Sequence, residues 1–299
     1  MVVEDFISYI GIQKRYSART LELYREYIND FREFISPADD GEFIKELKSN
    51  AVRGFVATSL DSGLNSRTVN LKLSAISSFC NYLLKKGLIE SNPVNKVPRP
   101  KTSKRLPHFY TEGAISDYLS SSIDDGDFFA LRNRTIVLLL YSTGMRRAEL
   151  ASLCLSDWDR GRRVMRVRGK GDKEREIPVT RELESMLSRY LNEMTELYSD
   201  NTESRLFLTD TGQPLYLSFV NKVVKDELSK APGFTGKRSP HMLRHSIATH
   251  LLNNGADLNS IKEVLGHSSL AATQVYTHNS FEQMKKIFLT AHPRAKKGG

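Results

Sequence analysis

The sequence predicts a mostly α-helical protein of two domains: an all-helical first domain, and an α+β second domain that carries a small antiparallel sheet. Apolar residues recur at steps of three and four over most of the chain, which is the helical period. One proline-rich basic stretch, residues 92–107, interrupts this pattern. The chain has 299 residues, of which 39% are hydrophobic, and this is enough to form two modest cores.

The first domain, residues 1–91, is predicted from two amphipathic helices and two shorter helical stretches near residues 6–10 and 43–60. Leu21, Tyr24, Ile28, Phe31 and Ile35 mark a helix begun by a cap at Ser17, and Val69, Leu73, Ile76, Cys80 and Leu83 mark a second helix that ends at Gly87. With these four helical stretches, the domain is predicted to be all-helical.

Residues 92–107 are predicted to link the domains. Their prolines block helix formation and their basic side chains repel one another, which favours an extended chain. The linker is either simply solvated or lies along the phosphates of a nucleic acid.

The second domain, residues 108–299, is predicted to be helical around a small sheet. Two strands, 163–168 and 174–179, flank the hairpin turn Gly169-Lys170-Gly171-Asp172, and a shorter hairpin is expected at 206–215. Helices are expected at 131–141, 149–155, 181–198, 219–228 and 240–254, with a break at Gly144.

Charge and cysteine content narrow the function classes. The net charge of +9 favours a polyanionic partner, with nucleic acid ahead of an anionic membrane surface. Cys80 and Cys154 lie in apolar helical patterns and are expected to be buried thiols in a reducing cytosol. The N-terminus lacks a signal-peptide pattern, and the longest apolar run, 136–141, is too short to span a bilayer. A soluble cytoplasmic protein is therefore expected.

His241 and Arg244 are candidate phosphate ligands. Ser239 at the cap and Pro240 at the first helical position predict a helix start, which places both side chains in the first turns on one face. Free amide groups at a helix start favour a phosphate, and a guanidinium binds its oxygens in a bidentate way. Taken alone, the pair also fits a local cap and a surface ion pair.

A metal site is not predicted. His241 and His245 are four residues apart on one helix, but no Glu lies between them and no Cys or carboxylate cluster follows with ligand spacing. No cofactor is expected.

Two further cationic residues, Arg146 and Lys170, lie where a helix or strand is expected to be interrupted. Arg146 follows Gly144, so it can point into a pocket, and Glu149 is placed to orient it. Lys170 lies at the tip of the predicted hairpin between two glycines. The spacing of these glycines does not match a phosphate-binding loop.

His267 and Tyr276 complete the candidates. Gly266 ends a short helix that begins near Leu258, so His267 is expected to leave on a tight turn toward a site. Tyr276 on the next segment would, taken alone, be a core residue with a satisfied hydroxyl.

These motifs together resemble the tyrosine recombinase (phage integrase) family, most closely its bacterial Xer subgroup. The matching segments are Thr143-Gly144-Met145-Arg146 with Glu149, Gly169-Lys170-Gly171-Asp172-Lys173-Glu174-Arg175, Pro240-His241-Met242-Leu243-Arg244-His245, Leu265-Gly266-His267-Ser268, Val275-Tyr276-Thr277-His278 and the tail His292-Pro293-Arg294-Ala295. The likeness covers essentially the whole chain, with a SAM-like core-binding domain followed by a catalytic domain.

The resemblance implies that Tyr276 is a nucleophile that forms a 3′-phosphotyrosyl link to DNA. It implies that Arg146 and Arg244 neutralise the non-bridging oxygens with help from His241 and His267, and that Lys170 protonates the leaving 5′-hydroxyl. His241 is expected to share the general-base role. No metal or nucleotide is needed for such an exchange.

The resemblance also implies a C-shaped clamp around a double-stranded DNA recombination site and a homo- or hetero-tetramer with a paralogous recombinase. Control by a DNA translocase and a role in resolving chromosome dimers at cell division are expected. The apolar stripe Phe281, Met284, Ile287 and Phe288 is expected to dock on a neighbouring protomer rather than on its own domain. The alternatives are a mobile-element integrase or transposase, a type IB topoisomerase, a non-catalytic helical DNA-binding regulator and a metal-dependent nuclease.

Overall fold

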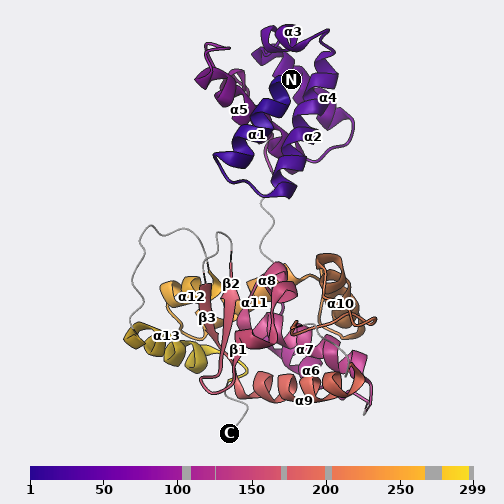
Figure 1. Cartoon of the computed structure of the whole chain (residues 1–299), viewed down its shortest axis with the longest axis vertical. Helices are drawn as coiled ribbons and strands as arrows, with labels where there is room; N and C mark the ends of the chain where they lie inside the picture. Colours follow the sequence, from indigo (N-terminus) through magenta and orange to yellow (C-terminus); the bar gives the residue numbers. More distant parts are fainter. Residues whose placement is uncertain (103–108, 125, 170–173, 199–203, 267–277, 296–299) are drawn as a thin grey trace. The chain divides into compact units, whose positions relative to one another are not determined.

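The computed structural model describes residues 1–102, 109–124, 126–169, 174–198, 204–266 and 278–295, and only the backbone of 278–283 (Figure 1). The chain divides into two compact units, Met1–Leu106 and Pro107–Gly299. Each unit has a separate hydrophobic core. In the described part of the chain, no helix is both long and apolar enough to cross a bilayer.

The first unit consists of five α-helices, as far as it is described: α1 (Val2–Ile12), α2 (Ala18–Ile35), α3 (Asp40–Lys45), α4 (Ser49–Asp61) and α5 (Ser66–Lys85). The two predicted amphipathic helices are confirmed as α2 and α5. The predicted cap is also confirmed, because the Ser17 hydroxyl accepts a hydrogen bond from the backbone N–H of Thr20. The helices enclose a core rich in phenylalanine, in which Phe31 packs edge-on against Phe43 and Phe55.

The start of the proline-rich stretch is part of the first unit rather than an extended chain. Pro93–Lys96 form a 3₁₀ turn, and Val94 and Val97 are buried in the first core. The Asn92 amide donates to Ser77 and Asn81 of α5 and its oxygen accepts from the backbone N–H of Val94. Two valines and one buried amide therefore anchor a segment that the prolines alone would leave extended.

The second unit is helical around one sheet (Figure 1). Its described elements are α6 (Glu112–Ser120), α7 (Phe128–Thr143), α8 (Arg147–Ser152), β1 (Trp158–Asp159), β2 (Val164–Arg168), β3 (Glu174–Pro178), α9 (Arg181–Leu197), α10 (Leu217–Lys230), α11 (Pro240–Asn253), α12 (Leu258–Leu265) and α13 (His278–Ala291). Helix α7 is buried on nearly every face and packs against α9, α10 and α11. It is therefore the central helix of the unit.

The sheet is antiparallel in the order β1-β2-β3, and Val164 pairs with Pro178 at one end and Arg168 with Glu174 at the other. The two predicted strands are confirmed as β2 and β3. The two-residue β1 was not predicted, because a strand this short leaves no alternation to detect. The short hairpin expected at 206–215 is present in reduced form, as a turn closed by one antiparallel bridge between Leu208 and Pro214.

Cys154 differs from its prediction. Helix α8 ends at Ser152, and Cys154 precedes a 3₁₀ turn, Leu155–Asp157, where it is partly exposed. The buried environment expected of Cys80 is confirmed, and burial raises the pKa of its thiol to about 12.

The apolar stripe of α13 packs on its own unit. Met284 and Phe288 are buried in the second core and Ile287 lies against it, while the Phe281 side chain is outside the described residues. In this single chain, the structure thus corrects the expectation that these side chains are presented to a neighbouring protomer.

The segment after α13 is held by a buried histidine. His292 is fully buried, its Nε2 lies 3.1 Å from the backbone oxygen of Ser142, and its Nδ1 accepts from the backbone N–H of Arg294. Arg294 forms an ion pair with Glu182 of α9. Because Nδ1 is an acceptor, the imidazole is neutral with its proton on Nε2, and burial lowers its pKa to about 4.

Acid should therefore destabilise the second unit through His292. The pKa of His292 is about 4 in the folded protein and 6.5 in the unfolded chain, so the unfolded chain binds the proton first as the pH falls. The free energy of unfolding is therefore unaffected by His292 above pH 6.5 and decreases as the pH falls toward 4. The free energy of unfolding should fall by about 3 kcal/mol over this interval. Urea unfolding at pH 7 and pH 4.5 should show a smaller loss for His292→Gln than for the wild type. His250, whose pKa is also lowered by burial, titrates in both proteins and therefore contributes equally to both losses. Equal total losses in the two proteins would contradict the assignment of the effect to His292.

Candidate functional site

Arg146 is placed by a glycine turn between α7 and α8. Gly144 ends α7 in the left-handed conformation with φ of 61°, which favours glycine, and Arg146 then caps α8. A Cβ added at Gly144 would lie 2.4 Å from Cδ2 of Leu265. The absence of a side chain therefore lets the end of α7 approach the end of α12 closely.

The Arg146 side chain is held from two directions. Its Nη1 donates to Oε1 of Glu149 at 2.9 Å, and its Nη2 donates to the backbone oxygen of Gly266 at 2.8 Å. Glu149 also accepts the backbone N–H of Arg146 on Oε2 at 2.7 Å. The predicted orienting role of Glu149 is confirmed, and 42% of the Arg146 side chain stays accessible to solvent.

Arg244 reaches the same place from α11. It is buried, and its Nη1 and Nη2 donate to the backbone oxygens of Gly144 and Leu265, each at 2.6 Å. Burial, together with the nearby charge of Arg146, lowers the pKa of the Arg244 guanidinium to about 10, so it remains charged at neutral pH. The alternative of a surface ion pair is therefore wrong for Arg244.

A third guanidinium, that of Arg175, was not assigned any role from the sequence. It lies on β3, donates to Oε1 and Oε2 of Glu149 at 3.0 and 2.8 Å, and donates from Nε to the backbone oxygen of Val264 at 2.8 Å. Strand alternation places it on the same side as Ile177, which is buried. The sequence signal that could have identified Arg175 was an arginine on the inward face of a predicted strand.

Arg146, Arg175 and Arg244 form what we call the arginine cluster. They donate to three successive carbonyls at the end of α12, those of Gly266, Val264 and Leu265 respectively. These are the groups that a helix end leaves without intrahelical partners. Glu149 is the carboxylate that pairs with two of the three cations, and its pKa is lowered because the bonds from Arg175 and Arg146 outweigh the effect of burial. The cluster therefore keeps an excess of positive charge, which suits an anionic ligand.

His241 lies exposed in the first turn of α11, one turn before Arg244. Ser239 occupies the predicted cap position, but its side chain makes no capping hydrogen bond. Partial desolvation of the imidazole ring and the positive charge of Arg244 lower the pKa of His241, which favours the neutral imidazole at pH 7. Neutral imidazole can accept as well as donate a proton.

The other three candidates, Lys170, His267 and Tyr276, lie outside the described residues. Lys170 falls between β2 and β3, which carries Arg175. His267 directly follows Gly266, and Tyr276 falls between α12 and α13. The structure therefore brings Arg146 and Arg244 together and gives no position for these three.

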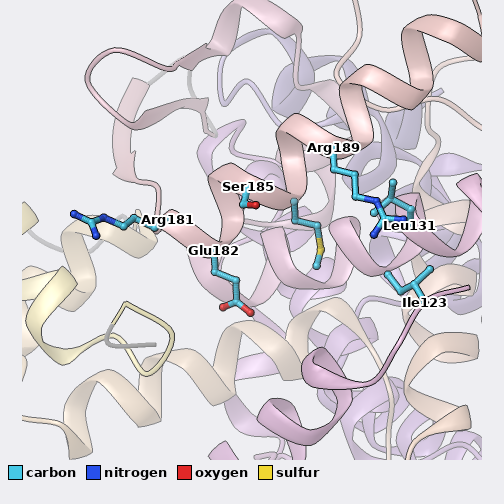
Figure 2. A pocket seen from close by; sticks show the side chains of 7 residues that line it. Ile123, Leu131, Arg181, Glu182, Ser185 and Arg189 are labelled. Carbon is cyan, nitrogen blue, oxygen red and sulfur yellow. The ribbon is translucent and has the colours of Figure 1, made fainter. Parts of the chain in front are cut away.

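A cavity of the second unit lies away from this site. A shallow cavity of about 450 Å³ lies along α9, beside residues of α7 and the segment before it, and contains none of the candidate residues (Figure 2). It is lined by Ile123, Leu131, Arg181, Glu182, Ser185, Met186 and Arg189. Among the described residues, no group of three or more His, Cys, Asp or Glu side chains could hold a metal ion.

Known proteins resemble both units. Residues 3–87 match the model described as phage integrase, N-terminal SAM-like domain, and residues 115–283 match that of the phage integrase family. The chain is 39% identical over 298 residues to the tyrosine recombinase XerC of Bacillus pumilus, covering 98% of this chain and 97% of the relative. It is 36% identical over 296 residues to XerC of Bacillus subtilis, covering 98% and 96%.

A solved structure shares the fold. The XerH site-specific recombinase, in its post-cleavage complex with a palindromic difH substrate, superposes with a TM-score of 0.70 at 24% identity, covering 95% of this chain and 83% of the other.

Replacing Glu149 by Gln should destabilise the second unit strongly. The side chain of Arg175 is only 9% exposed, so its charge would remain buried without a counter-ion. Loss of one partner from such a pair costs about 3 to 5 kcal/mol. The measurement is the free energy of urea unfolding at pH 7.

The matched control for this prediction is Glu174→Gln. Glu174 pairs with Arg168 on the exposed side of the same sheet, where both side chains are largely in solvent. Its loss should change the free energy of unfolding by less than about 1 kcal/mol. Similar losses in the two variants would mean that the arginine cluster does not depend on Glu149.

Proposed function

Since this chain belongs to the phage integrase family and is a site-specific tyrosine recombinase, we propose that it cuts DNA with Tyr276 as the nucleophile and Arg146 and Arg244 as the phosphate ligands. The observation that carries the proposal is the convergence of these two guanidinium groups on the end of α12. Each uses two N–H donors on backbone or Glu149 oxygens and retains others, because a guanidinium carries five. Both can therefore donate to a phosphate.

The two arginines would act on the charge of the reacting phosphate. A phosphodiester carries one negative charge, and attack by an oxyanion increases the charge on its non-bridging oxygens. Fixed guanidinium groups stabilise that charge most in the transition state, where an arginine is worth on the order of 10³ to 10⁵ in rate. Their field would also favour the phenolate of Tyr276, whose pKa is ordinarily about 10.

The remaining candidates would handle protons. Attack by Tyr276 on phosphorus forms the 3′-phosphotyrosyl bond and breaks the bond to the 5′-oxygen, which must gain a proton. Lys170 is proposed to supply it. His241 would accept the tyrosine proton, which its lowered pKa supports, and His267 would donate to a non-bridging oxygen. In the reverse step, a 5′-hydroxyl of another strand attacks the phosphotyrosine and restores Tyr276.

The biological role we propose is Xer-type recombination that resolves chromosome dimers at cell division. Similarity to XerC proteins over nearly the full length of both chains supports it. The working assembly would be a tetramer on a DNA recombination site, with one or two kinds of subunit. The structure of XerH with its difH substrate supports DNA as the partner. The second candidate is a mobile-element integrase, because a transposon integrase shares the fold.

A nicked DNA site should trap the covalent intermediate. When cleavage releases a short 5′-hydroxyl fragment that diffuses away, resealing fails and the adduct accumulates. Wild-type protein in excess chelator should form an adduct that survives denaturation in detergent, whereas Tyr276→Phe should form none, because it lacks the attacking oxygen. The amount of adduct is measured from the gel mobility of end-labelled DNA. Equal amounts from both proteins would refute the assignment of Tyr276 as the nucleophile.

Adducts mapped in the native cell should separate the two roles. Sequencing DNA that is covalently bound to the protein should locate a single chromosomal site for a dimer-resolving enzyme, since one crossover at one site per chromosome separates a dimer. An integrase would instead be trapped at the ends of a mobile element. Loss of the gene should also leave dividing cells with joined chromosomes, and normal separation would contradict the Xer role.

A further inference from the structure

We propose that Arg175 is a positioning residue for the DNA cleavage step. It would hold Arg146 in place through Glu149, and the end of α12 through Val264. The proposal rests on the proposed function, because it takes Arg146 as a ligand of the reacting phosphate. It adds a residue to the machinery that does not itself contact DNA.

The contacts of Arg175 show why it would act through other residues. Both terminal nitrogens face the Glu149 carboxylate and Nε faces the carbonyl of Val264, so each nitrogen of the guanidinium has a partner inside the protein. Only 9% of the side chain is exposed. Arg146, in contrast, has 42% of its side chain exposed. Arg244 is as buried as Arg175 but bonds to the described residues through Nη1 and Nη2 alone, so it is the bonding of all three nitrogens that sets Arg175 apart from the proposed phosphate ligands.

Glu149 transmits the effect of Arg175 to Arg146. Its Oε1 accepts from both Arg146 and Arg175, and its Oε2 accepts from Arg175 and from the backbone N–H of Arg146. Four donors fix the carboxylate, and the carboxylate fixes the Arg146 guanidinium. Arg175 also shares the negative charge of Glu149. Without Arg175, the Glu149 charge would be matched by Arg146 alone, and Arg146 would have less net charge to offer a phosphate.

Arg175 also joins two segments that lead to other candidate residues. It is the second residue of β3, just after the segment that contains Lys170, and it bonds to the last turn of α12, just before His267. A Cβ added at Gly266 would lie 3.0 Å from Nη1 of Arg175, and Gly266 has φ of 65°. A glycine at this turn is what allows the guanidinium to approach so closely.

Arg175→Lys tests the proposal. Lysine keeps the charge but cannot bond to both Glu149 oxygens and to Val264 at once. With the nicked DNA site in excess protein, the first-order rate of adduct formation should fall on the order of 10²-fold, the size expected when a catalytic group is misplaced by about 1 Å. The dissociation constant for the non-covalent complex should change less than about threefold, because Arg175 does not contact DNA.

Arg134→Lys is the matched control. Arg134 is another buried arginine that donates to carbonyls at a helix end, those of Tyr118 in the last turn of α6 and Ser121 just after it. Among the described residues it has no bond to the arginine cluster. It should lower the melting temperature without slowing cleavage at a temperature where the protein is folded. If Arg134→Lys slows cleavage as much as Arg175→Lys, or if Arg175→Lys cleaves at the wild-type rate, the proposal is overturned.

A methylphosphonate at the scissile position separates positioning from general loosening. This substitution replaces one charged non-bridging oxygen by a methyl group, so the reaction depends less on a guanidinium there. The rate ratio of wild type to Arg175→Lys should shrink at least tenfold on this substrate if Arg175 acts through Arg146. An unchanged ratio would mean a merely structural role and would overturn the proposal. If Arg175→Lys melts below the assay temperature, Arg175→Gln, which leaves no uncompensated buried cation, takes its place in the same comparison.

The failure of the proposed function would look different. In that case wild-type protein would form no adduct on either substrate, and the positioning role would fall with it. Adduct formation by wild type but not by Tyr276→Phe establishes cleavage by Tyr276, and the Arg175 variants and the methylphosphonate substrate then decide the proposal.

Discussion

The end of α12 is the constraint on which the second unit depends. A helix end leaves carbonyl groups without partners, and here three successive ones, from Val264 to Gly266, lie where the protein must supply donors. Three arginines supply them, which concentrates positive charge at one point. Glu149 offsets only part of that charge. The same hydrogen bonds therefore complete the fold and gather positive charge at the candidate site.

Much of this could be predicted from the sequence, where local patterns decide the structure. Helical steps defined α2 and α5, and Gly144 and Gly266 marked helix ends because both need a left-handed backbone. The partnership of Glu149 with Arg146 could also be inferred, because residues three apart on a helix lie side by side. Each of these inferences uses residues that are close in the chain.

What could not be predicted depends on contacts between distant residues. Arg175 meets Glu149 and Val264, and neither is near it in sequence. The burial of Val94 and Val97 could not be predicted, because two apolar residues among prolines show no periodicity. The apolar stripe on α13 is compatible with packing on its own core and with packing on a partner, because the sequence of an apolar face does not show what covers it. Tertiary packing decides such cases.

The close approach at the two glycine turns limits how this site can evolve. A side chain at Gly144 would collide with Leu265, and one at Gly266 would crowd the guanidinium of Arg175. A change at either glycine is thus tolerated only with a compensating change at its neighbour, and even then the backbone conformation remains strained. Positions 144 and 265, and positions 266 and 175, are therefore coupled in space, so a substitution at one member of a pair changes the room left for the other.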